Sequence, residues 1–206
     1  MRIVTIGWRY AAVVLAIGLA PALLFPPVGI IVTGLTLGII WFFRDPTRHA
    51  PGQGLVSPAD GRVELIRQEG SRLRLGIYMN VLNVHVNRVP INGSIIHRQS
   101  IPGGYWPAFA EAAERNERVD FVIDAEVGEV EVSLIAGSLA RVITPYVDVD
   151  DQVVQGDRIG HIAFGSRVDV VLPAGITHED VLVTPGDRVT AGESMLVAEQ
   201  AIRRIS

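Results

Sequence analysis

An uncharged, largely apolar run occupies residues 10–43, and it limits the folds open to the chain more than any other feature. A membrane-spanning helix needs about 20 apolar residues and the core of a signal peptide about 7–15, so the run exceeds both. Pro26-Pro27 divides it into two segments of about sixteen residues each, because a Pro pair ends one helix and can begin the next. We therefore expect a membrane-attached helical hairpin, with a single tilted, Pro-kinked span as the alternative.

Basic residues flank this run on both sides and indicate its orientation. They are Arg2 and Arg9 before the run, and Arg44 and Arg48 after it. Since basic residues favour the cytoplasmic side of a membrane, we expect both ends of the hairpin at the cytoplasmic face of the cell membrane, together with the domain that follows. The expected division is a membrane-anchoring segment over 1–48 and a β-rich domain over 49–206.

The rest of the chain has the pattern of short strands separated by Gly, Pro, Asn and Asp. Such alternation of apolar and polar residues between turn residues is typical of half-buried strands. The candidate strands are Gly61–Arg67, Leu73–Met79, His85–Val89, Gly93–Gln99, Val119–Asp124, Glu129–Ile135, Leu139–Thr144, Arg158–Phe164, Val168–Leu172 and Ser194–Glu199. This spacing predicts a mainly β, barrel-sandwich domain like the biotinyl and lipoyl domains. The composition of Ala108–Arg118 predicts one surface helix.

A weak internal repeat supports this fold. Asp151-Gln-Val-Val-Gln-Gly-Asp157 matches Asp187-Arg-Val-Thr-Ala-Gly-Glu193 at an offset of 36 residues. Each copy has the form acidic-x-Val-x-x-Gly-acidic before an apolar stretch, as turns of barrel-sandwich domains do. The repeat supports the fold and implies nothing about chemistry.

Two residue types are missing from the chain, and their absence excludes several chemistries. All eighteen basic residues are Arg, so no Lys can hold pyridoxal phosphate or carry biotin or lipoate. Because the chain has no Cys, disulfides, thiolate zinc sites and Cys nucleophiles are excluded as well. The net charge of −4 and the dispersed arginines argue against nucleic-acid binding. No spacing typical of metal ligands occurs, and no metal is expected.

Gly165 and Ser166 form a Gly-Ser step between two apolar stretches. By itself, such a step indicates a bulge or a tight turn. An amine-handling enzyme of this composition would need a carbonyl group from another source than pyridoxal phosphate. Self-cleavage at a Gly-Ser bond, which leaves a pyruvoyl group, is one such source. Both interpretations are open from these residues alone.

Other short motifs accompany this step in a fixed order. They are Phe42-Phe-Arg-Asp-Pro46, Ser57-Pro-Ala-Asp-Gly61, Val84-His-Val-Asn-Arg-Val-Pro90, Ile101-Pro-Gly-Gly104 and Arg115-Asn-Glu-Arg118. Together with Phe164-Gly-Ser-Arg167 they resemble the phosphatidylserine decarboxylases, specifically the short form found in archaea and many bacteria. The resemblance covers the whole chain.

The resemblance implies a self-processing, pyruvoyl-dependent enzyme. Ser166 Oγ would attack the carbonyl carbon of Gly165, and the resulting ester would be eliminated and hydrolysed to a pyruvoyl group with loss of ammonia. The products would be chains 1–165 and 166–206, which remain partners. The pyruvoyl ketone would form a Schiff base with the serine amine of phosphatidylserine, or of archaetidylserine in an archaeon, and CO₂ and an ethanolamine phospholipid would be released. No pyridoxal phosphate and no metal are implied, and a homo-oligomer is left open.

The resemblance also assigns candidate roles to individual residues. Asp60 matches the acidic residue that the family pairs with a His during self-cleavage, although an Asp-Gly turn would look the same. His85 lies in a matched motif and could exchange protons at neutral pH, although a packed core His is the alternative. Arg88 stands where the long form has a second His, which leaves open the group that activates Ser166. The candidate substrate-binding residues are Arg88, Asn116, Glu117 and Arg118. The remaining histidines, His49, His97, His161 and His178, are expected to be structural or solvated.

Two other classes of protein fit parts of the sequence. A non-enzymatic, membrane-anchored barrel-sandwich adaptor explains the hairpin and the repeat, but not the context of Gly165-Ser166, and it would remain one intact chain. A membrane-linked serine hydrolase would need an intact Ser166 hydroxyl. The Gly-x-Ser-x-Gly motif of many hydrolases is absent, because Phe164 and Val168 occupy the Gly positions.

Overall fold

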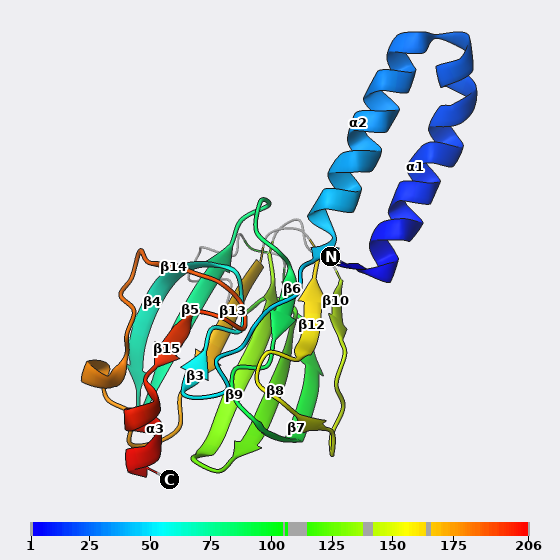
Figure 1. The fold of residues 1–206 in the computed structure, drawn as a ribbon. Helices are drawn as coiled ribbons and strands as arrows, with labels where there is room; N and C mark the ends of the chain where they lie inside the picture. Colours follow the sequence, from blue (N-terminus) through cyan, green and yellow to red (C-terminus); the bar gives the residue numbers. More distant parts are fainter. Residues whose placement is uncertain (1, 105, 107–114, 138–141, 164–165, 206) are drawn as a thin grey trace. The chain divides into compact units, whose positions relative to one another are not determined.

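The computed structural model describes residues 2–104, 106, 115–137, 142–163 and 166–205. Its contacts divide the chain into two units, Met1–Thr47 and Arg48–Ser206. The first unit is helical and the second consists mostly of strands (Figure 1). The prediction of a mainly β fold that follows two apolar helices is therefore confirmed.

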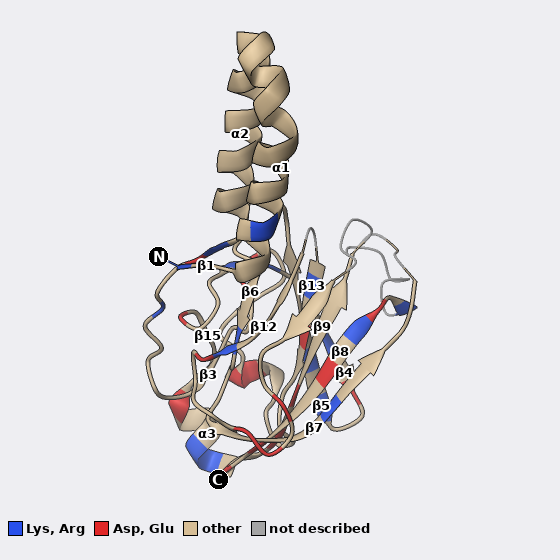
Figure 2. Ribbon diagram, turned by 90° about the vertical axis from the view of Figure 1, so that its right-hand side faces the viewer, with Lys and Arg blue, Asp and Glu red and all other residues tan. Residues whose placement is uncertain are grey.

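Two apolar helices make up most of the first unit. α1 (Thr5–Leu24) and α2 (Pro26–Phe42) are separated by Phe25, whose backbone is extended, as the residue before a Pro tends to be. The short strands β1 (Arg2–Ile3) and β2 (Arg44–Asp45) pair in antiparallel register and join the two ends of the hairpin. Figures 1 and 2 show α1 and α2 side by side, and the colours of Figure 2 show few charged residues along them. The hairpin expected from the Pro pair is thus present in the fold.

The two helices of this hairpin pack closely, and α1 is long enough to cross a membrane. A Cβ at Gly18 would lie only 2.3 Å from Cγ2 of Val32, so glycine is what allows α1 to approach α2 here. At about 1.5 Å per residue, the 20 residues of α1 extend for about 30 Å, the thickness of the apolar core of a membrane. By length and composition α1 can cross a membrane, whereas α2 is a shorter apolar helix of 17 residues.

An antiparallel sheet of eight strands forms the larger part of the second unit, in the order β11-β7-β8-β9-β13-β5-β4-β14. A three-stranded sheet, β10-β12-β6, and the pair β15-β3 lie beside it. The bounds of these elements are β3 (Leu55–Val56), β4 (Gly61–Glu69), β5 (Arg72–Met79), β6 (Val86–Arg88), β7 (Gly93–Ile101), β8 (Arg118–Ala125), β9 (Gly128–Ala136), β10 (Ile143–Pro145), β11 (Gln152–Val153), β12 (Arg158–Ile162), β13 (Ser166–Val171), the 3₁₀ helix η2 (His178–Asp180), β14 (Arg188–Val189), β15 (Met195–Val197) and α3 (Glu199–Ile205).

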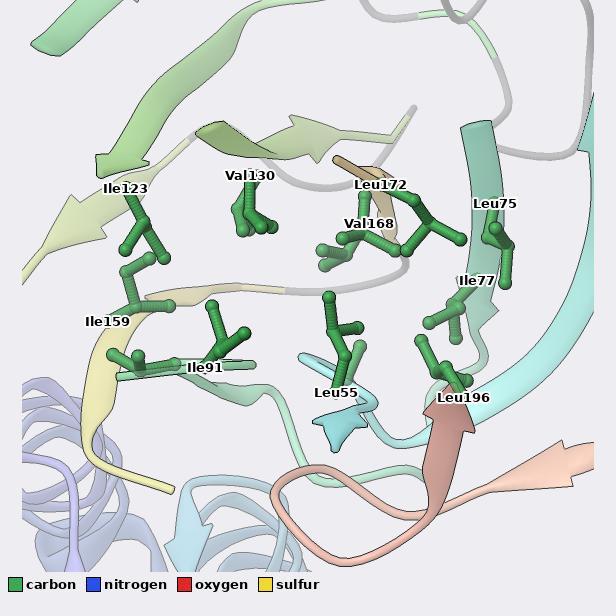
Figure 3. Packing of buried hydrophobic residues seen from close by; sticks show 14 of the residues in the cluster. Leu55, Leu75, Ile77, Ile91, Ile123, Val130, Ile159, Val168, Leu172 and Leu196 are labelled. Carbon is green, nitrogen blue, oxygen red and sulfur yellow. The ribbon is translucent and has the colours of Figure 1, made fainter. Parts of the chain in front are cut away.

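The core lies between the large sheet and the smaller groups of strands. Val168 and Val170 of β13 are paired with Ile77 and Leu75 of β5, and all four side chains are fully buried. Because successive strand residues point to opposite faces, these positions define the inner face of the large sheet. Figure 3 shows side chains of the other strands and loops packed against this face, among them Leu55, Ile91, Ile159 and Leu196.

The two copies of the weak repeat form turns of the same kind that contact each other. Gly156 has φ 89° and Gly192 has φ 74°, both in the left-handed region that favours glycine. A Cβ on Gly192 would lie 3.4 Å from the Cα of Gly156. β11 and β14, which lie next to these turns, pair with β7 and β4 at the two edges of the large sheet. The repeat therefore marks two equivalent corners of the β domain.

The surface helix expected over Ala108–Arg118 can be compared with the structure only at its C-terminal end. Residues 108–114 lie outside the described residues, but Asn116 forms a β-bridge with Gly104, and Arg118 begins β8. The prediction of helix is therefore wrong for this end of Ala108–Arg118. Pairing of β8 with β9 outweighs the weak helical preference of the Glu and Arg residues there.

Two further boundaries differ from expectation near the chain's C-terminal half. The strand expected at Leu139–Thr144 is described only from residue 142, where its remainder contributes to β10. The strand expected at Ser194–Glu199 ends at Val197, and α3 follows. In α3, Glu199 forms an ion pair with Arg203 one turn later, which stabilises a helix that the apolar pattern does not reveal.

Candidate active site

Ser166 is the first residue of β13 and lies near the middle of the large sheet. Its register partners are Met79 on β5 and Ala136 on β9. Since it shares a face with Val168, its side chain points to the inner face of the sheet. Ser166 is fully buried, and its Oγ has no hydrogen-bond partner in the described part of the chain. A buried polar atom without a partner costs about 1–3 kcal/mol, so this hydroxyl calls for a functional explanation.

β6 passes over the inner face beside Ser166. Asn87 Nδ2 lies 3.5 Å from Sδ of Met79, the residue paired with Ser166. Asn87 is fully buried, and its Oδ1 makes no hydrogen bond with any described residue. His85 immediately precedes β6, and its carbonyl accepts the Ile162 N–H at 3.2 Å, which continues the pairing with β12. By strand alternation, His85 and Asn87 both lie on the side that faces the large sheet.

The turn between β5 and β6 fixes the ring of His85. The Asn83 carbonyl lies 3.0 Å from His85 Nδ1. Because a carbonyl can only accept, Nδ1 carries the hydrogen, and the neutral ring keeps its lone pair on Nε2. The turn itself is held by Asn83 Oδ1, which accepts the Asn80 N–H at 2.9 Å, and by Asn80 Oδ1, which accepts the Leu82 N–H at 2.8 Å. The contact with the Asn83 carbonyl therefore favours the tautomer of His85 that carries its hydrogen on Nδ1.

Asn116 is bound to the end of β9, on the other side of Ser166. Its Nδ2 donates to the carbonyls of Ala136 and Trp106, each at 2.7 Å, and its Oδ1 accepts the Trp106 N–H at 2.7 Å. The Ala136 N–H in turn donates to the Glu117 carbonyl at 2.9 Å. Asn116 and Glu117 therefore hold the backbone of the residue that is paired with Ser166.

The Pro-Gly-Gly motif meets the Asn-Glu-Arg motif at this point. A Cβ at Gly103 would lie 2.3 Å from the carbonyl carbon of Asn116, so only glycine permits the approach. Gly104 donates its N–H to the Arg115 carbonyl at 2.8 Å and accepts the Glu117 N–H at 3.2 Å. The two motifs, separate in the sequence, form one support beside Ser166.

Asp60 is held at a different place. Arg48 Nη2 donates to both of its carboxylate oxygens at 2.8 Å, and Asp60 Oδ1 also accepts the Ala191 N–H at 2.8 Å. Arg48 Nη1 reaches Glu193 at 3.3 Å. The side chains of Arg48 and Asp60 are only 12% and 14% exposed. Within the described residues, the hydrogen bonds of Asp60 do not include the other two candidate catalytic residues.

Arg88 and Arg118 point away from the Ser166 hydroxyl. Arg88 alternates with its neighbour on β6, and its Nη1 donates to the Gly156 carbonyl at 3.1 Å. Arg118 is paired with Ile135, which is paired with Arg167, and this row lies on the outer face of the large sheet. The structure therefore brings Asn116 and Glu117 next to the strand position of Ser166, but not the side chains of these two arginines.

The outer face carries a polar groove of about 370 Å³. Figure 2 shows acidic and basic residues gathered on β4, β5 and β8. Arg167 and Asp169 are buried on this face and form two hydrogen bonds of 2.5 and 2.7 Å. Burial raises the pKa of Glu64 on the same face, Arg167 opposes the increase and Asp169 adds to it. Since Ser166 faces the other way, this groove is separate from the Ser166 site.

Comparison with known proteins supplies the family. The sequence model described as phosphatidylserine decarboxylase matches residues 35–197. The chain is 46% identical over 193 residues to a protein of Halobacterium salinarum named as a candidate archaetidylserine decarboxylase proenzyme, covering 92% of this chain and 95% of the relative. It is 48% identical over 161 residues to the phosphatidylserine decarboxylase proenzyme of Streptomyces avermitilis, covering 78% and 74% of the two chains. The chain belongs to the phosphatidylserine decarboxylase family.

The motif-based resemblance to the phosphatidylserine decarboxylases is therefore confirmed. The relatives include both archaeal and bacterial proteins, as the resemblance implied. A third relative, a candidate archaetidylserine decarboxylase proenzyme of Methanosarcina acetivorans, is 46% identical over 164 residues, covering 79% of this chain and 76% of its own. Each of the three relatives is named a proenzyme, which means a precursor that is later processed. Gly165, the other half of the expected cleavage site, lies outside the described residues.

Asn87 lies within the motif Val84–Pro90 but is not among the candidate site residues named from the sequence. Its signal in the sequence is its spacing, two residues after His85 in an expected strand, which puts both on one face.

His161, expected to be structural or solvated, is buried on the opposite face of the β6–β12 pair, next to Val86. Its Nδ1 lies 2.7 Å from the Tyr146 hydroxyl, and burial lowers its pKa to about 4. In the part of the chain that the structure describes, no cluster of three His, Asp or Glu residues could hold a metal.

Proposed function

We propose that this protein is a self-processing decarboxylase that converts a serine phospholipid to the ethanolamine phospholipid and CO₂. The observation that carries the proposal is Ser166, whose buried, unpartnered hydroxyl begins a central strand in a member of the decarboxylase family. The relatives are named for phosphatidylserine or for archaetidylserine. Because the two lipids share the phosphoserine headgroup and differ in the chains, the headgroup is the part that we propose this site recognises.

In the proposed processing, Ser166 Oγ attacks the carbonyl carbon of Gly165. A C–O bond forms, the peptide C–N bond breaks, and the proton lost by oxygen ends on the amine nitrogen. Elimination then releases Gly165 as a carboxylate, and hydrolysis of residue 166 releases ammonia and leaves a pyruvoyl group. The products are chains 1–165 and 166–206. Glycine suits the position before the cut because it leaves its carbonyl carbon unobstructed.

The surroundings of residue 166 fit a pyruvoyl group. The group would form in place from a residue that is already buried, and it would remove the hydroxyl donor that has no acceptor in the described precursor. Asn87 could then donate a hydrogen bond to a carbonyl at this position, because Met79 is only a weak acceptor for its Nδ2. When present, the pyruvoyl group supplies an electrophilic ketone that withdraws electrons from the bond to the departing carboxylate.

The described side chains support different roles around this group. We assign proton transfer to His85, because its Nδ1 is committed to the Asn83 carbonyl and its Nε2 is the basic nitrogen. We propose that Asn116 and the backbone of Glu117 contribute to substrate binding indirectly, because their hydrogen bonds hold Ala136, the partner of Ser166, in place. Asp60 retains a proposed role in self-cleavage, for which its carboxylate would act from within the Arg48 ion pair.

We further propose that α1 and α2 attach the enzyme to the cell membrane, with the β domain on the cytoplasmic side. The support is the apolar length of α1 and the basic residues at both ends of the hairpin. An anchored enzyme meets a lipid substrate that stays in the bilayer, so membrane attachment and lipid decarboxylation agree. Self-association remains compatible with this arrangement.

Intact mass spectrometry of the wild-type protein beside Ser166→Ala tests the processing. The wild type should yield two fragments that meet between residues 165 and 166, the smaller with a pyruvoyl terminus, and the variant should stay whole. Since the hydroxyl has no partner, Ser166→Ala should not lower the free energy of unfolding, so misfolding cannot explain a missing cut.

Release of labelled CO₂ from vesicles that contain carboxyl-labelled serine phospholipid tests the second reaction. Wild-type protein should release it, whereas Ser166→Ala should not. An uncut wild-type chain that is folded and membrane-bound would instead indicate the adaptor, and labelling of Ser166 by a fluorophosphonate would indicate the hydrolase.

A further inference from the structure

Two buried polar atoms without partners lie on the inner side of the large sheet, close to the start of β13. Ser166 Oγ is a donor without an acceptor, and Asn87 Oδ1 is an acceptor without a donor, within the described residues. The two residues are linked through Met79, which is paired with Ser166 and lies 3.5 Å from Asn87 Nδ2. If the Asn87 amide were turned by 180°, one of its polar atoms would still lack a good partner.

Stability alone does not explain an asparagine at this position. Asn87 is fully buried, and among the described residues its side chain forms one hydrogen bond, to a thioether sulfur, which is a weak acceptor. A buried amide that is only half satisfied destabilises a fold, and an apolar side chain of similar volume would not. The neighbouring positions Val86 and Val89 are apolar and buried, so the strand accommodates such residues. The amide is therefore retained at a cost to stability.

We propose that Asn87 is a positioning residue for self-cleavage. Neither Asn87 Oδ1 nor Ser166 Oγ is hydrogen-bonded in the described structure, and in the reacting conformation Oδ1 accepts the Ser166 O–H and orients the oxygen for attack. This inference rests on the proposed function. In the step that Asn87 assists, the Oγ–C bond forms, the peptide C–N bond breaks, and the proton ends on the amine nitrogen. Asn87 stays neutral throughout, because an amide orients a hydroxyl but does not deprotonate it.

The proposal accounts for the substitution of Arg88 for the second His of the long form. Arg88 is on the opposite side of β6 and binds the Gly156 carbonyl, so its side chain is turned away from Ser166. Asn87, one residue earlier, faces the sheet and contacts Met79, the residue that is paired with Ser166. In this arrangement Asn87 orients the Ser166 hydroxyl, and a different residue on the same face, His85, can transfer the proton.

Pulse-chase translation of the full-length chain into lipid nanodiscs measures the rate of cleavage. Asn87→Leu should slow it by about 10- to 100-fold, because a hydroxyl that is not oriented reacts less often. Asn87→Asp should restore part of the rate, and this rate should rise with pH as the new carboxylate ionises, with His85 present in every variant. Melting temperatures are measured in the uncleavable Ser166→Ala background, where Asn87→Leu should match or exceed the parent.

Asn116→Leu is the matched control, since Asn116 is also fully buried but has three good hydrogen bonds. Its melting temperature should fall together with its rate of cleavage. The role of Asn87 would be overturned if Asn87→Leu were cleaved at the wild-type rate, or if its slower cleavage were matched by a lower melting temperature. Either result would leave the proposed function intact. An uncut wild-type chain would overturn both.

Discussion

The carboxylate of Asp60 forms a structural ion pair with Arg48, and we also propose a role for it in self-cleavage. Arg48 binds both of its oxygens, and the Ala191 N–H binds one of them. With side chains that are 12% and 14% exposed, the pair lies between a surface salt bridge and a fully buried one. Loss of either partner should therefore affect the fold, and a reduced activity of an Asp60 variant would not by itself reveal chemistry.

Arg48→Met and Asp60→Asn separate the two roles of this pair. Arg48→Met removes the ion pair but keeps the carboxylate, so it should lower the free energy of unfolding by about 1–3 kcal/mol while cleavage continues. Asp60→Asn keeps an oxygen for the Ala191 N–H but removes the charge, so it should stop cleavage with a smaller loss of stability. Urea denaturation in the Ser166→Ala background gives the free energies, and intact mass gives the extent of cleavage. Normal cleavage of Asp60→Asn would leave Asp60 with a structural role alone.

Individual residues show what the sequence can and cannot reveal about the site. The alternation of Val168 and Val170 is enough to predict a strand over Val168–Leu172, although β13 begins two residues earlier, at Ser166, and spacing is enough to relate Asn87 to His85. The contact of Arg48 with Glu193 joins residues that are 145 apart, and no local pattern indicates it. Such contacts depend on the order of the strands, which the sequence leaves undetermined.

At the scale of elements, β13 combines two opposite environments. After Ser166, its inner positions Val168 and Val170 are apolar, whereas Arg167 and Asp169 are buried as an ion pair on its outer face. The sequence pattern predicts a strand here but not that both of its edges are paired, because β5 and β9, its neighbours in the sheet, are distant in the chain. Likewise, Gly and Asp turns are enough to predict most strand boundaries, but composition alone does not reveal that the end of Ala108–Arg118 is extended.

The sheet β10-β12-β6 contains a titratable group that should make stability depend on pH. His161 on β12 is buried, and burial lowers its pKa from 6.5 to about 4. The unfolded chain therefore binds more protons than the folded chain between these values, so stability is complete above pH 6.5 and is lost as pH falls through about 4. The difference amounts to at most about 3 kcal/mol.

Urea denaturation of Ser166→Ala and Ser166→Ala/His161→Gln at several pH values checks this dependence. The parent should lose stability more steeply than the double variant between pH 6.5 and 4, because a glutamine side chain does not titrate. Above pH 6.5 the difference between the two free energies should be constant. Parallel curves over the whole range would show that His161 has the same pKa in the folded and the unfolded chain, which would contradict a pKa lowered by burial.

For the molecule as a whole, the hairpin predicts that both of its ends lie on one side of the membrane. β1 pairs with β2, so the start of α1 and the end of α2 are neighbours. Since the chain has no Cys, Thr5→Cys and Thr47→Cys each introduce a single thiol. A membrane-impermeant maleimide should label both variants in inside-out vesicles and neither in intact spheroplasts. Labelling from opposite sides would instead indicate one span.

The central place of β13 has a consequence for the mature, two-chain protein. If the chain is cut before Ser166, the short chain contributes a strand that is paired on both sides, and its β14 and β15 pair with β4 and β3 of the long chain. The precursor can reach this arrangement by a unimolecular reaction. After the cut, an unfolded molecule must find its missing half by diffusion, so refolding becomes bimolecular and slows with dilution. The uncut precursor can therefore refold as a single chain, whereas the mature protein can refold only when its two chains meet.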